Sequence, residues 1–293
     1  MTRRVMLLGA SGQIGQALRA QPAPKDWYIH AYSRAECDIT DHLAVKNVIQ
    51  KLQPELIINA AAMTAVDVCE KELDNARKVN FDGPANLAAQ CSVSDIPLIH
   101  ISTDYVFDGK ATTPYTVDAP MSPVNAYGES KMLGEEAVRH ELAWHVILRI
   151  SSVFGAFGNN LLTRTMKSID ERDELKCVTD QTACPTAAQD VAEAIVTMGD
   201  AILRGKVNGF GTFHLAGTPP CNRLEFVQAI MEAYAPFTKK RPQILPALTS
   251  DFPGLAERPA YAVLDCTKIA NVYGIQQRPW RDGLKEAMQE LMR

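Results

Sequence analysis

The sequence lacks the cysteine and histidine patterns of disulfide-stapled and metal-binding proteins. Its seven cysteines are scattered, odd in number and without a C-x-x-C pair, which argues against a disulfide framework and a structural zinc site. The six histidines show no spacing typical of metal ligands. We therefore predict reduced thiols and no metal site.

Long apolar runs are also absent. The run from Val5 to Leu8 ends at Gly9, which is too short for the apolar core of a signal peptide. No stretch approaches the roughly 20 apolar residues that cross a bilayer. We expect a soluble, cytoplasmic protein without a membrane partner.

The chain has no excess of basic residues. Its 30 Lys and Arg stand against 34 Asp and Glu, and no long basic run occurs, so nucleic acid is not an expected partner.

The chain is long enough, and apolar enough, to bury a large hydrophobic core. With 293 residues, 46% of them hydrophobic, the chain can form one large core or an α/β domain with a smaller second lobe.

Short apolar segments alternate with helical patterns along the first half of the chain. We predict strands at 4–8, 27–32, 56–59, 97–101 and 144–150. Such alternation is typical of an α/β fold with a Rossmann-type doubly wound parallel sheet.

The regularity falls after residue 150, and we expect a second lobe there. Residues 1–150, with a return segment near 184–215, are assigned to the sheet domain. Residues 151–183 and 216–293 are assigned to a smaller α/β substrate lobe.

Three glycines follow the first predicted strand and open a helix. Gly9, Gly12 and Gly15 allow a tight turn, close approach of a pyrophosphate, and close helix-to-strand packing. The helix N-terminus would point at the phosphates. This context predicts a dinucleotide-binding domain, with a purely structural turn as the alternative. The predicted contacts of the turn are Gly9, Ser11, Gly12, Gln13, Ile14 and Gly15.

The second predicted strand ends in Ser33 and Arg34, where many NAD-binding folds carry an acidic residue. An arginine there favours a 2′-phosphate, hence NADPH, although NADH stays open and Arg34 could be an ordinary exposed residue. Asp38, with Ile39, is expected at the adenine edge. Thr40 or Asp41 is expected to cap the next helix.

Small residues at the end of the third strand suit the nicotinamide end of the cofactor. Ala60, Ala61 and Ala62 let a ribose and a nicotinamide lie against the backbone, although small residues also occur where helices pack closely. Asn80 lies in a predicted helix, and a buried amide there needs a partner. A structural role and a cofactor role for Asn80 are equally open.

Tyr127 and Lys131 stand at i and i+4 of a predicted helix, so both side chains rise from one face. A neighbouring ammonium would lower the pKa of the phenol toward neutrality and make Tyr127 a usable acid. Coincidence is the alternative. Ser102 or Thr103, at the carboxyl end of the fourth strand, would orient a substrate carbonyl, unless both hydroxyls only cap the following turn.

Four motifs together resemble the extended short-chain dehydrogenase/reductase superfamily: the glycine turn, Asn59-Ala60-Ala61, the run 102–109, and the Tyr127/Lys131 pair. Within it, the sequence is most similar to the dTDP-4-dehydrorhamnose reductase family. That family's pattern also matches at 158–160, 180–181, 185–186 and 258–259, so the resemblance spans nearly the whole chain.

The resemblance implies NADPH-dependent reduction of the 4-keto group of dTDP-4-dehydro-6-deoxy-L-mannose. The product would be dTDP-L-rhamnose, used for cell-surface polysaccharide such as lipopolysaccharide O-antigen. By position, Thr103, Tyr127 and Lys131 become the catalytic set, with Tyr127 as proton donor and Lys131 also holding the nicotinamide ribose.

The resemblance also implies a set of substrate contacts. The matching positions are Thr64, Val66, Thr103, Asp104, Tyr105, Ser152, Asn160 and Arg258. Either Arg258 or Lys167 is expected to meet the diphosphate, with an exposed salt bridge as the alternative.

Two departures from the family pattern stand out. Ser152 occupies a position where the family usually has a tryptophan, with Phe154 or Tyr261 as candidate replacements. Gln16 and Ala17 follow Gly15 where some relatives carry the acidic residue of a magnesium-linked dimer, so monomer and homodimer both stay open. The alternative functions are reduction or epimerisation of another nucleotide sugar, and a non-catalytic NADP-binding regulatory subunit.

Overall fold

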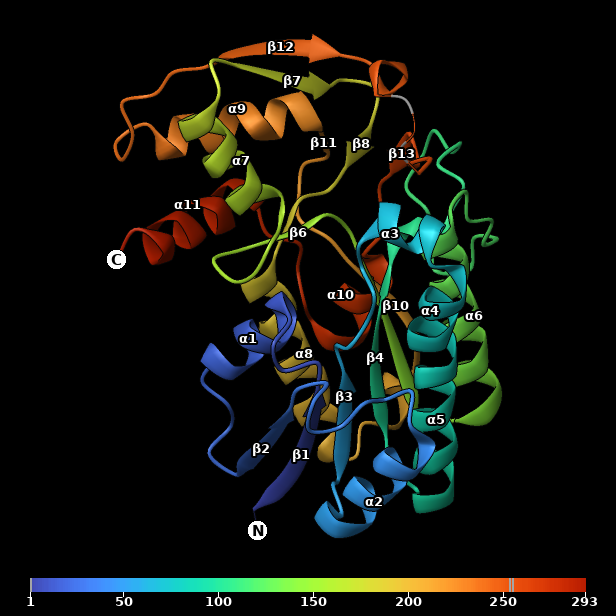
Figure 1. Cartoon of the computed structure of the whole chain (residues 1–293). Coiled ribbons are helices and arrows are strands. Elements are labelled where there is room, and N and C mark those ends of the chain that lie inside the picture. The colour runs from blue at the N-terminus through green and yellow to red at the C-terminus, as the bar shows by residue number, and fades with distance from the viewer. Residues whose placement is uncertain (1, 253, 255) are drawn as a thin grey trace.

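The computed structural model describes residues 2–252, 254 and 256–293, and Figure 1 shows a larger body below a smaller lobe. The body is built on a six-stranded sheet with the order β10-β5-β4-β3-β1-β2, in which every pairing is parallel. Its strands are β1 (Arg3–Leu8), β2 (Trp27–Tyr32), β3 (Leu56–Asn59), β4 (Leu98–Thr103), β5 (His145–Ile150) and β10 (Gly211–Leu215). The predicted doubly wound α/β fold is confirmed.

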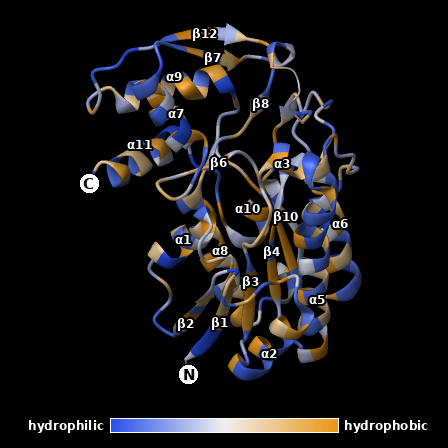
Figure 2. Ribbon diagram, in the orientation of Figure 1, coloured by the Kyte–Doolittle hydropathy of each residue, from blue (hydrophilic) through white to orange (hydrophobic). Residues whose placement is uncertain are grey.

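The central strands are apolar because both faces of the sheet are covered. Side chains of a strand alternate between the faces, so Val5 and Leu7 join one core while Met6 and Leu8 join the other. Figure 2 shows this concentration of hydrophobic residues on the strands and on the inner sides of the helices.

Helices supply the second half of each core. On the Val5 side these are α1 (Gln13–Ala20), α8 (Ala188–Leu203) and α10 (Thr267–Tyr273). On the Met6 side they are α2 (His42–Leu52), α5 (Gly83–Ser94) and α6 (Ala126–Glu141). Since α10 packs on the sheet, this part of 216–293 lies outside the lobe to which we assigned it.

The predicted helix that contains Asn80, expected at 74–90, is interrupted. It is observed as α4 (Leu73–Arg77), a π-helical turn (Lys78–Asp82) and α5. At the π turn, the carbonyl oxygen of Asn80 approaches Gly134 of α6 so closely that a Cβ on Gly134 would lie 2.1 Å from it. This irregularity could not be read from periodicity, because it depends on packing against a distant helix.

The lobe has its own core, in which Phe154, Leu162, Phe226 and Trp280 are buried. Three helices build it: α7 (Leu161–Glu171), α9 (Arg223–Tyr234) and α11 (Trp280–Leu291). A parallel pair, β7 (Glu174–Val178) and β12 (Gln243–Ala247), lies over them at the top of Figure 1.

The remaining elements are short. These are α3 (Val66–Lys71), the 3₁₀ turns at Asp104–Val106, Val207–Gly209 and Thr249–Asp251, and the two-residue strands β6 (Val153–Phe154), β8 (Thr182–Ala183), β9 (Thr186–Ala187), β11 (Cys221–Asn222) and β13 (Tyr261–Ala262).

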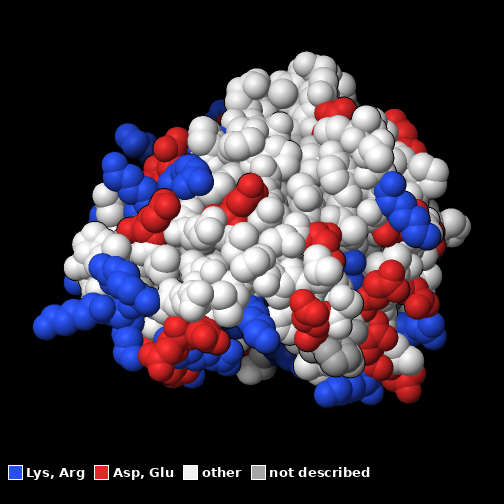
Figure 3. Space-filling view, turned by 90° about the horizontal axis from the view of Figure 1, so that it is seen from above, with Lys and Arg blue, Asp and Glu red and all other residues white. Residues whose placement is uncertain are grey.

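Seen from above, the molecule carries acidic and basic side chains interspersed around its rim (Figure 3). All seven cysteines are buried and unbridged. Across the described part of the chain, no helix is long and apolar enough to span a membrane, and no group of three or more His, Cys, Asp or Glu is arranged to hold a metal ion.

Candidate active site

The strand order places a topological switch point between β1 and β3, because the chain leaves β1 for β2 on one side and returns to β3 on the other. Ligands of open parallel sheets bind beyond the carboxyl ends of the strands at such a point. The glycine turn lies there. Gly9 has a φ of 77°, and a Cβ on Gly15 would lie 2.2 Å from the carbonyl oxygen of Gly9, so side chains are excluded at both positions.

A cavity of about 360 Å³ opens beside this turn. It brings together most of the predicted cofactor residues: Gly9, Ser11, Gly12, Arg34, Asp38, Ile39, Ala60, Ala61 and Ala62, with Cys37, Met63, Asn75 and Val79. Nearby, the buried Oε1 atom of Gln13 has no hydrogen-bond partner among the described residues. A pocket with a glycine cradle and a buried polar atom left unsatisfied fits a dinucleotide.

One side of this cavity carries a cation paired with a carboxylate, Arg34 with Asp38. The Arg34 side chain is 72% exposed, and its Nε donates to Asp38 Oδ2 over 3.1 Å. Burial raises the pKa of Asp38, but hydrogen bonds from Thr40 and Arg34 outweigh it and hold that pKa below its usual range. The Ser33 hydroxyl instead donates to Glu36, so Ser33 shapes the loop.

Two predicted cofactor residues serve the framework. Asn80 is fully buried, its Oδ1 accepts from Met63 N–H, and its Nδ2 donates to Met63 O and to Ser130 Oγ. Its amide is therefore fully engaged within the protein and positions Met63 at the cavity wall. Ile14 packs against the body core.

Tyr127 lies in the first turn of α6, held by two local features. Asn125 caps the helix by accepting from Gly128 N–H over 2.8 Å. A Cβ on Gly128 would lie 2.1 Å from the carbonyl oxygen of Tyr105, so glycine permits α6 to approach the end of β4. Burial raises the pKa of Tyr127, and a hydrogen bond with Thr103 acts in the opposite direction.

Lys131 is 1% exposed and points back into the sheet. Its Nζ donates to the carbonyl oxygen of Ile101 over 2.7 Å and lies 3.3 Å from His100 Nε2. Burial lowers the pKa of Lys131 to about 8. The expected lowering of the Tyr127 pKa by Lys131 is not observed, because this ammonium is directed to Ile101 and His100 and burial dominates at Tyr127.

The two candidate hydroxyls of β4 have different roles. Ser102 Oγ donates to the buried carboxylate of Glu135, which also pairs with Arg149, so Ser102 faces away from Tyr127. Thr103 Oγ1 accepts from Tyr105 N–H and donates to Asp104, so the capping interpretation holds for Thr103 while its hydroxyl also meets Tyr127.

Asp104 was expected to touch the sugar and instead supports Thr103. It is 2% exposed and accepts from Ser151 Oγ over 2.7 Å and from Thr103 Oγ1 over 3.0 Å. Burial raises the pKa of Asp104 to about 6. Its carboxylate therefore fixes the orientation of the Thr103 hydroxyl from behind.

A cleft of about 700 Å³ separates the body from the lobe. From the body, Thr64, Val66, Tyr105 and Arg258 line it, as expected of substrate contacts. The Tyr105 ring lies edge-on to the Tyr127 ring, with centroids 5.6 Å apart. The cleft thus lies beside the proton-donor candidate.

Thr103 and Asp104 do not line this cleft, and three further expected substrate residues are also absent from its lining. Asn160 caps α7: its Oδ1 accepts from Leu162 and Thr163, and its Nδ2 donates to Gly155 and Phe157 carbonyls, which leaves no free polar atom. Ser152 lines a separate cavity of about 40 Å³, with a φ of 43°. Lys167 is 73% exposed and pairs with Glu171, as the salt-bridge alternative states.

The lobe contributes residues that no motif signalled. Arg164, Lys176, Arg223 and Phe252 line the cleft from α7, β7, α9 and the segment after Thr249–Asp251. Phe252, rather than Phe154 or Tyr261, supplies an aromatic ring, because Phe154 is buried in the lobe core. Only the fold brings these separate segments to one surface.

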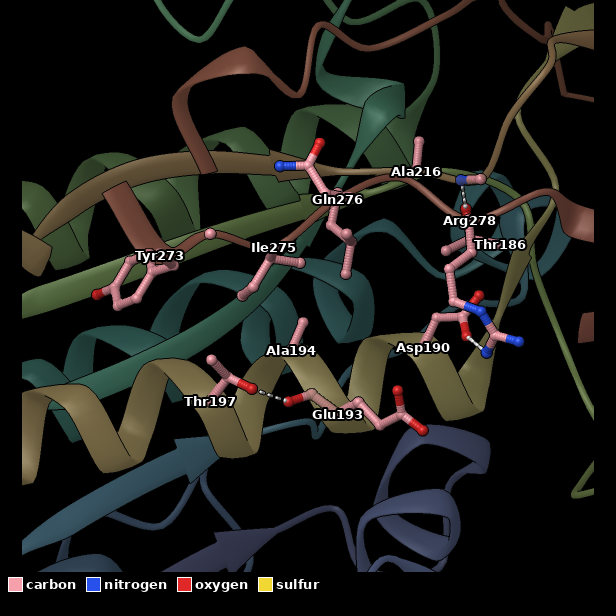
Figure 4. Close-up of a pocket in the computed structure, with 13 residues that line it drawn as sticks. Thr186, Asp190, Glu193, Ala194, Thr197, Ala216, Tyr273, Ile275, Gln276 and Arg278 are labelled. Carbon is pink, nitrogen blue, oxygen red and sulfur yellow. Dashed lines mark hydrogen bonds and ion pairs between the residues drawn. The ribbon is translucent and has the colours of Figure 1, made fainter. Parts of the chain in front are cut away.

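A further pocket, of about 270 Å³, lies between α8 and the loop after α10 (Figure 4). Two of its charged groups are already matched, since Arg278 donates to Asp190 over 2.5 Å and also pairs with Glu286. None of the predicted site residues lines it.

Fold and site together define a Rossmann-fold oxidoreductase of the short-chain dehydrogenase/reductase class. The model of the RmlD substrate binding domain family matches residues 3–293, and the chain belongs to that family. Spore coat polysaccharide biosynthesis protein SpsK of Bacillus subtilis is 36% identical over 98% of this chain and 97% of its own length. The dTDP-4-dehydrorhamnose reductase of Sinorhizobium fredii is 34% identical over 99% and 98%.

Solved structures show the same similarity. A dTDP-4-dehydrorhamnose reductase from Clostridium acetobutylicum superposes with a TM-score of 0.92, at 33% identity over 99% of this chain and 100% of that one. The Bacillus anthracis dTDP-4-dehydrorhamnose reductase, in complex with NADP, gives 0.90 at 33% identity with the same coverage.

Proposed function

We propose that this protein reduces the 4-keto group of dTDP-4-dehydro-6-deoxy-L-mannose to dTDP-L-rhamnose with NADPH. The observation that supports it most is that Thr103 and Tyr127 meet beside Tyr105, which lines the inter-lobe cleft and whose ring centroid is 5.6 Å from that of Tyr127. The dinucleotide cavity adjoins this cleft, since Met63 lines the one and Thr64 the other. The relatives at 34% identity that are named dTDP-4-dehydrorhamnose reductase give the substrate.

NADPH would supply the hydride at the sugar C4. The glycine turn and Ala60 to Ala62 would hold it, with Arg34 at the 2′-phosphate. An arginine suits that phosphate because its planar fork of N–H donors binds oxyanions bidentately.

The chain's own contribution is proton delivery. As negative charge develops on the carbonyl oxygen, Tyr127 donates its phenolic proton to it. Thr103, whose hydroxyl donates to Asp104 in this structure, would turn that proton to the carbonyl oxygen and hold it beside the phenol. The raised pKa of Tyr127 keeps the phenol protonated until that charge forms.

In this proposal Lys131 acts after cofactor binding. Its Nζ would leave the Ile101 carbonyl and hydrogen-bond the nicotinamide ribose instead. The ammonium would then lie closer to Tyr127 while the phenol gives up its proton. Since NADPH and nucleotide sugars are cytoplasmic metabolites, the proposal also places the protein in the cytoplasm.

The proposal is tested by NADPH oxidation with enzymatically prepared dTDP-4-dehydro-6-deoxy sugar, with UDP-linked and unlinked ketosugars as comparison substrates. We expect oxidation with the dTDP-linked ketone. Turnover only with another nucleotide sugar would assign a different reductase. NADPH binding without turnover on any ketone would favour the regulatory-subunit alternative.

A further inference from the structure

Arg223 is a cation without a counter-ion. It is the first residue of α9, it is only partly exposed, and its guanidinium makes no hydrogen bond or ion pair with any residue that the structure describes. Burial, together with the charges of Arg164 and Arg258, lowers the pKa of Arg223. A half-buried charge normally has a partner in the protein or in a ligand, because removing it from water is costly.

Other arginines inside the protein are neutralised. Arg149 is 2% exposed and donates to both oxygens of Glu135, over 2.8–3.1 Å. Arg258, on the body side of the cleft, donates to both oxygens of Asp67 at 2.7 Å. Arg258 is therefore already paired within the protein, which argues against its selection as the principal diphosphate contact.

The uncompensated charge lies on the lobe side of the cleft. Arg164 and Lys176 line the cleft with Arg223, and their side chains also lack a partner among the described residues. In all, the lining includes four cations against two carboxylates, Asp67 and Glu257, which gives a difference of two positive charges. This excess suits an anion with two charges or more.

The position of Arg223 relative to the reaction site supports the same ligand. Tyr105 lines both the cleft and the smaller cavity that Arg223 reaches, and its other side contacts the Tyr127 ring. A nucleotide sugar whose C4 lies at Tyr127 would extend past Tyr105, with its diphosphate next in line.

We propose that Arg223, assisted by Arg164, binds the diphosphate of the nucleotide sugar and is its main anchor on the lobe. This inference rests on the proposed function and assigns its phosphate contacts to residues outside the motifs of the family. Because these contacts come from the lobe and the catalytic residues from the body, the diphosphate holds the two parts together around the sugar.

The test compares binding of dTDP and thymidine to the full chain by isothermal titration calorimetry, for wild type and Arg223→Met. We expect Arg223→Met to weaken dTDP by about ten- to a hundredfold, the range for a hydrogen bond to a charged group, and to leave thymidine unchanged. Arg164→Met should give a smaller loss in the same direction. Lys167→Met, which removes an equal charge from the exposed side of the same α7, should change neither ligand.

Thermal unfolding separates a phosphate contact from a structural role. Removing an uncompensated charge should leave the melting temperature of ligand-free Arg223→Met equal to or above that of wild type, while dTDP should raise it less. Equal loss of dTDP and thymidine, or unchanged dTDP affinity, would overturn the proposal. Failure of this proposal can be told apart from failure of the proposed function, because nucleotide binding is measured without turnover. UDP, titrated in parallel, shows whether the protein prefers a different nucleotide.

Discussion

Lys131 donates a 2.7 Å hydrogen bond to the carbonyl oxygen of Ile101, on the strand that presents Thr103 to the site. The Lys131 side chain is also buried, so its charge destabilises the folded protein.

This burial predicts a pH-dependent stability. The pKa of Lys131 is lowered from 10.5 to about 8, so between these values the unfolded chain binds more protons than the folded one, and stability rises with pH across that window. Below pH 8 the folded protein carries the full cost of the charge. Relative to wild type, Lys131→Met should therefore have its most favourable free energy of unfolding near pH 7. This difference between the two proteins should shrink as the pH rises toward 10.5. Calorimetric melting temperatures of both proteins across pH 7–10.5 measure it, and a constant difference would refute it.

Lys131→Met should also reduce both turnover and NADPH affinity. In the proposal, the same Nζ places a positive charge near Tyr127 and hydrogen-bonds the nicotinamide ribose. Fluorescence titration of NADPH, run beside the kinetics, checks both effects. Loss of neither would remove Lys131 from the site.

Tyr127→Phe should lower kcat by roughly 10²-fold or more, since proton donation acts only as the alkoxide develops. The phenylalanine ring can still pack against Tyr105, so NADPH binding should stay intact. Single-turnover kinetics report the chemical step directly. An unchanged rate would exclude Tyr127 as the acid.

Arg34→Ala should weaken NADPH by about 1.5 kcal/mol or more and leave NADH unchanged, because only the 2′-phosphate distinguishes the two. The guanidinium is 72% exposed, so the difference should diminish as salt rises. Titration of both cofactors at two salt concentrations is the measurement. Equal losses would show that Arg34 only shapes its loop.

EDTA should leave NADPH oxidation unchanged, since Gln16 and Ala17, not an acidic residue, directly follow Gly15 and the described residues form no metal-binding cluster of His, Cys, Asp or Glu. Activity lost to EDTA and restored by magnesium would contradict this.

The strands and the cofactor turn were predictable because their signals are local. A buried parallel strand is a short apolar run, and the turn between β1 and α1 needs glycine wherever backbones approach, as at Gly15. These constraints act within a few residues, so the local sequence alone indicates the local structure.

The substrate side was less predictable because it forms from distant segments. Asn160 was expected to contact the sugar, yet its amide makes the hydrogen bonds that cap α7. The amide of Asn80 likewise makes its hydrogen bonds to Met63. Arg223 and Phe252 reach the cleft only through the fold of the lobe. A resemblance indicates positions that match, but the hydrogen-bond partners of each side chain decide whether it is free to bind.

The central claim is tested most directly by following the hydride. NADPH deuterated at the transferring C4 position is incubated with dTDP-4-dehydro-6-deoxy-L-mannose, and the product is analysed by NMR and mass spectrometry. The account predicts dTDP-L-rhamnose carrying one deuterium at C4 of the sugar, formed by wild type and much more slowly by Tyr127→Phe. Absence of deuterium from that carbon, or equal rates for the two proteins, would contradict it.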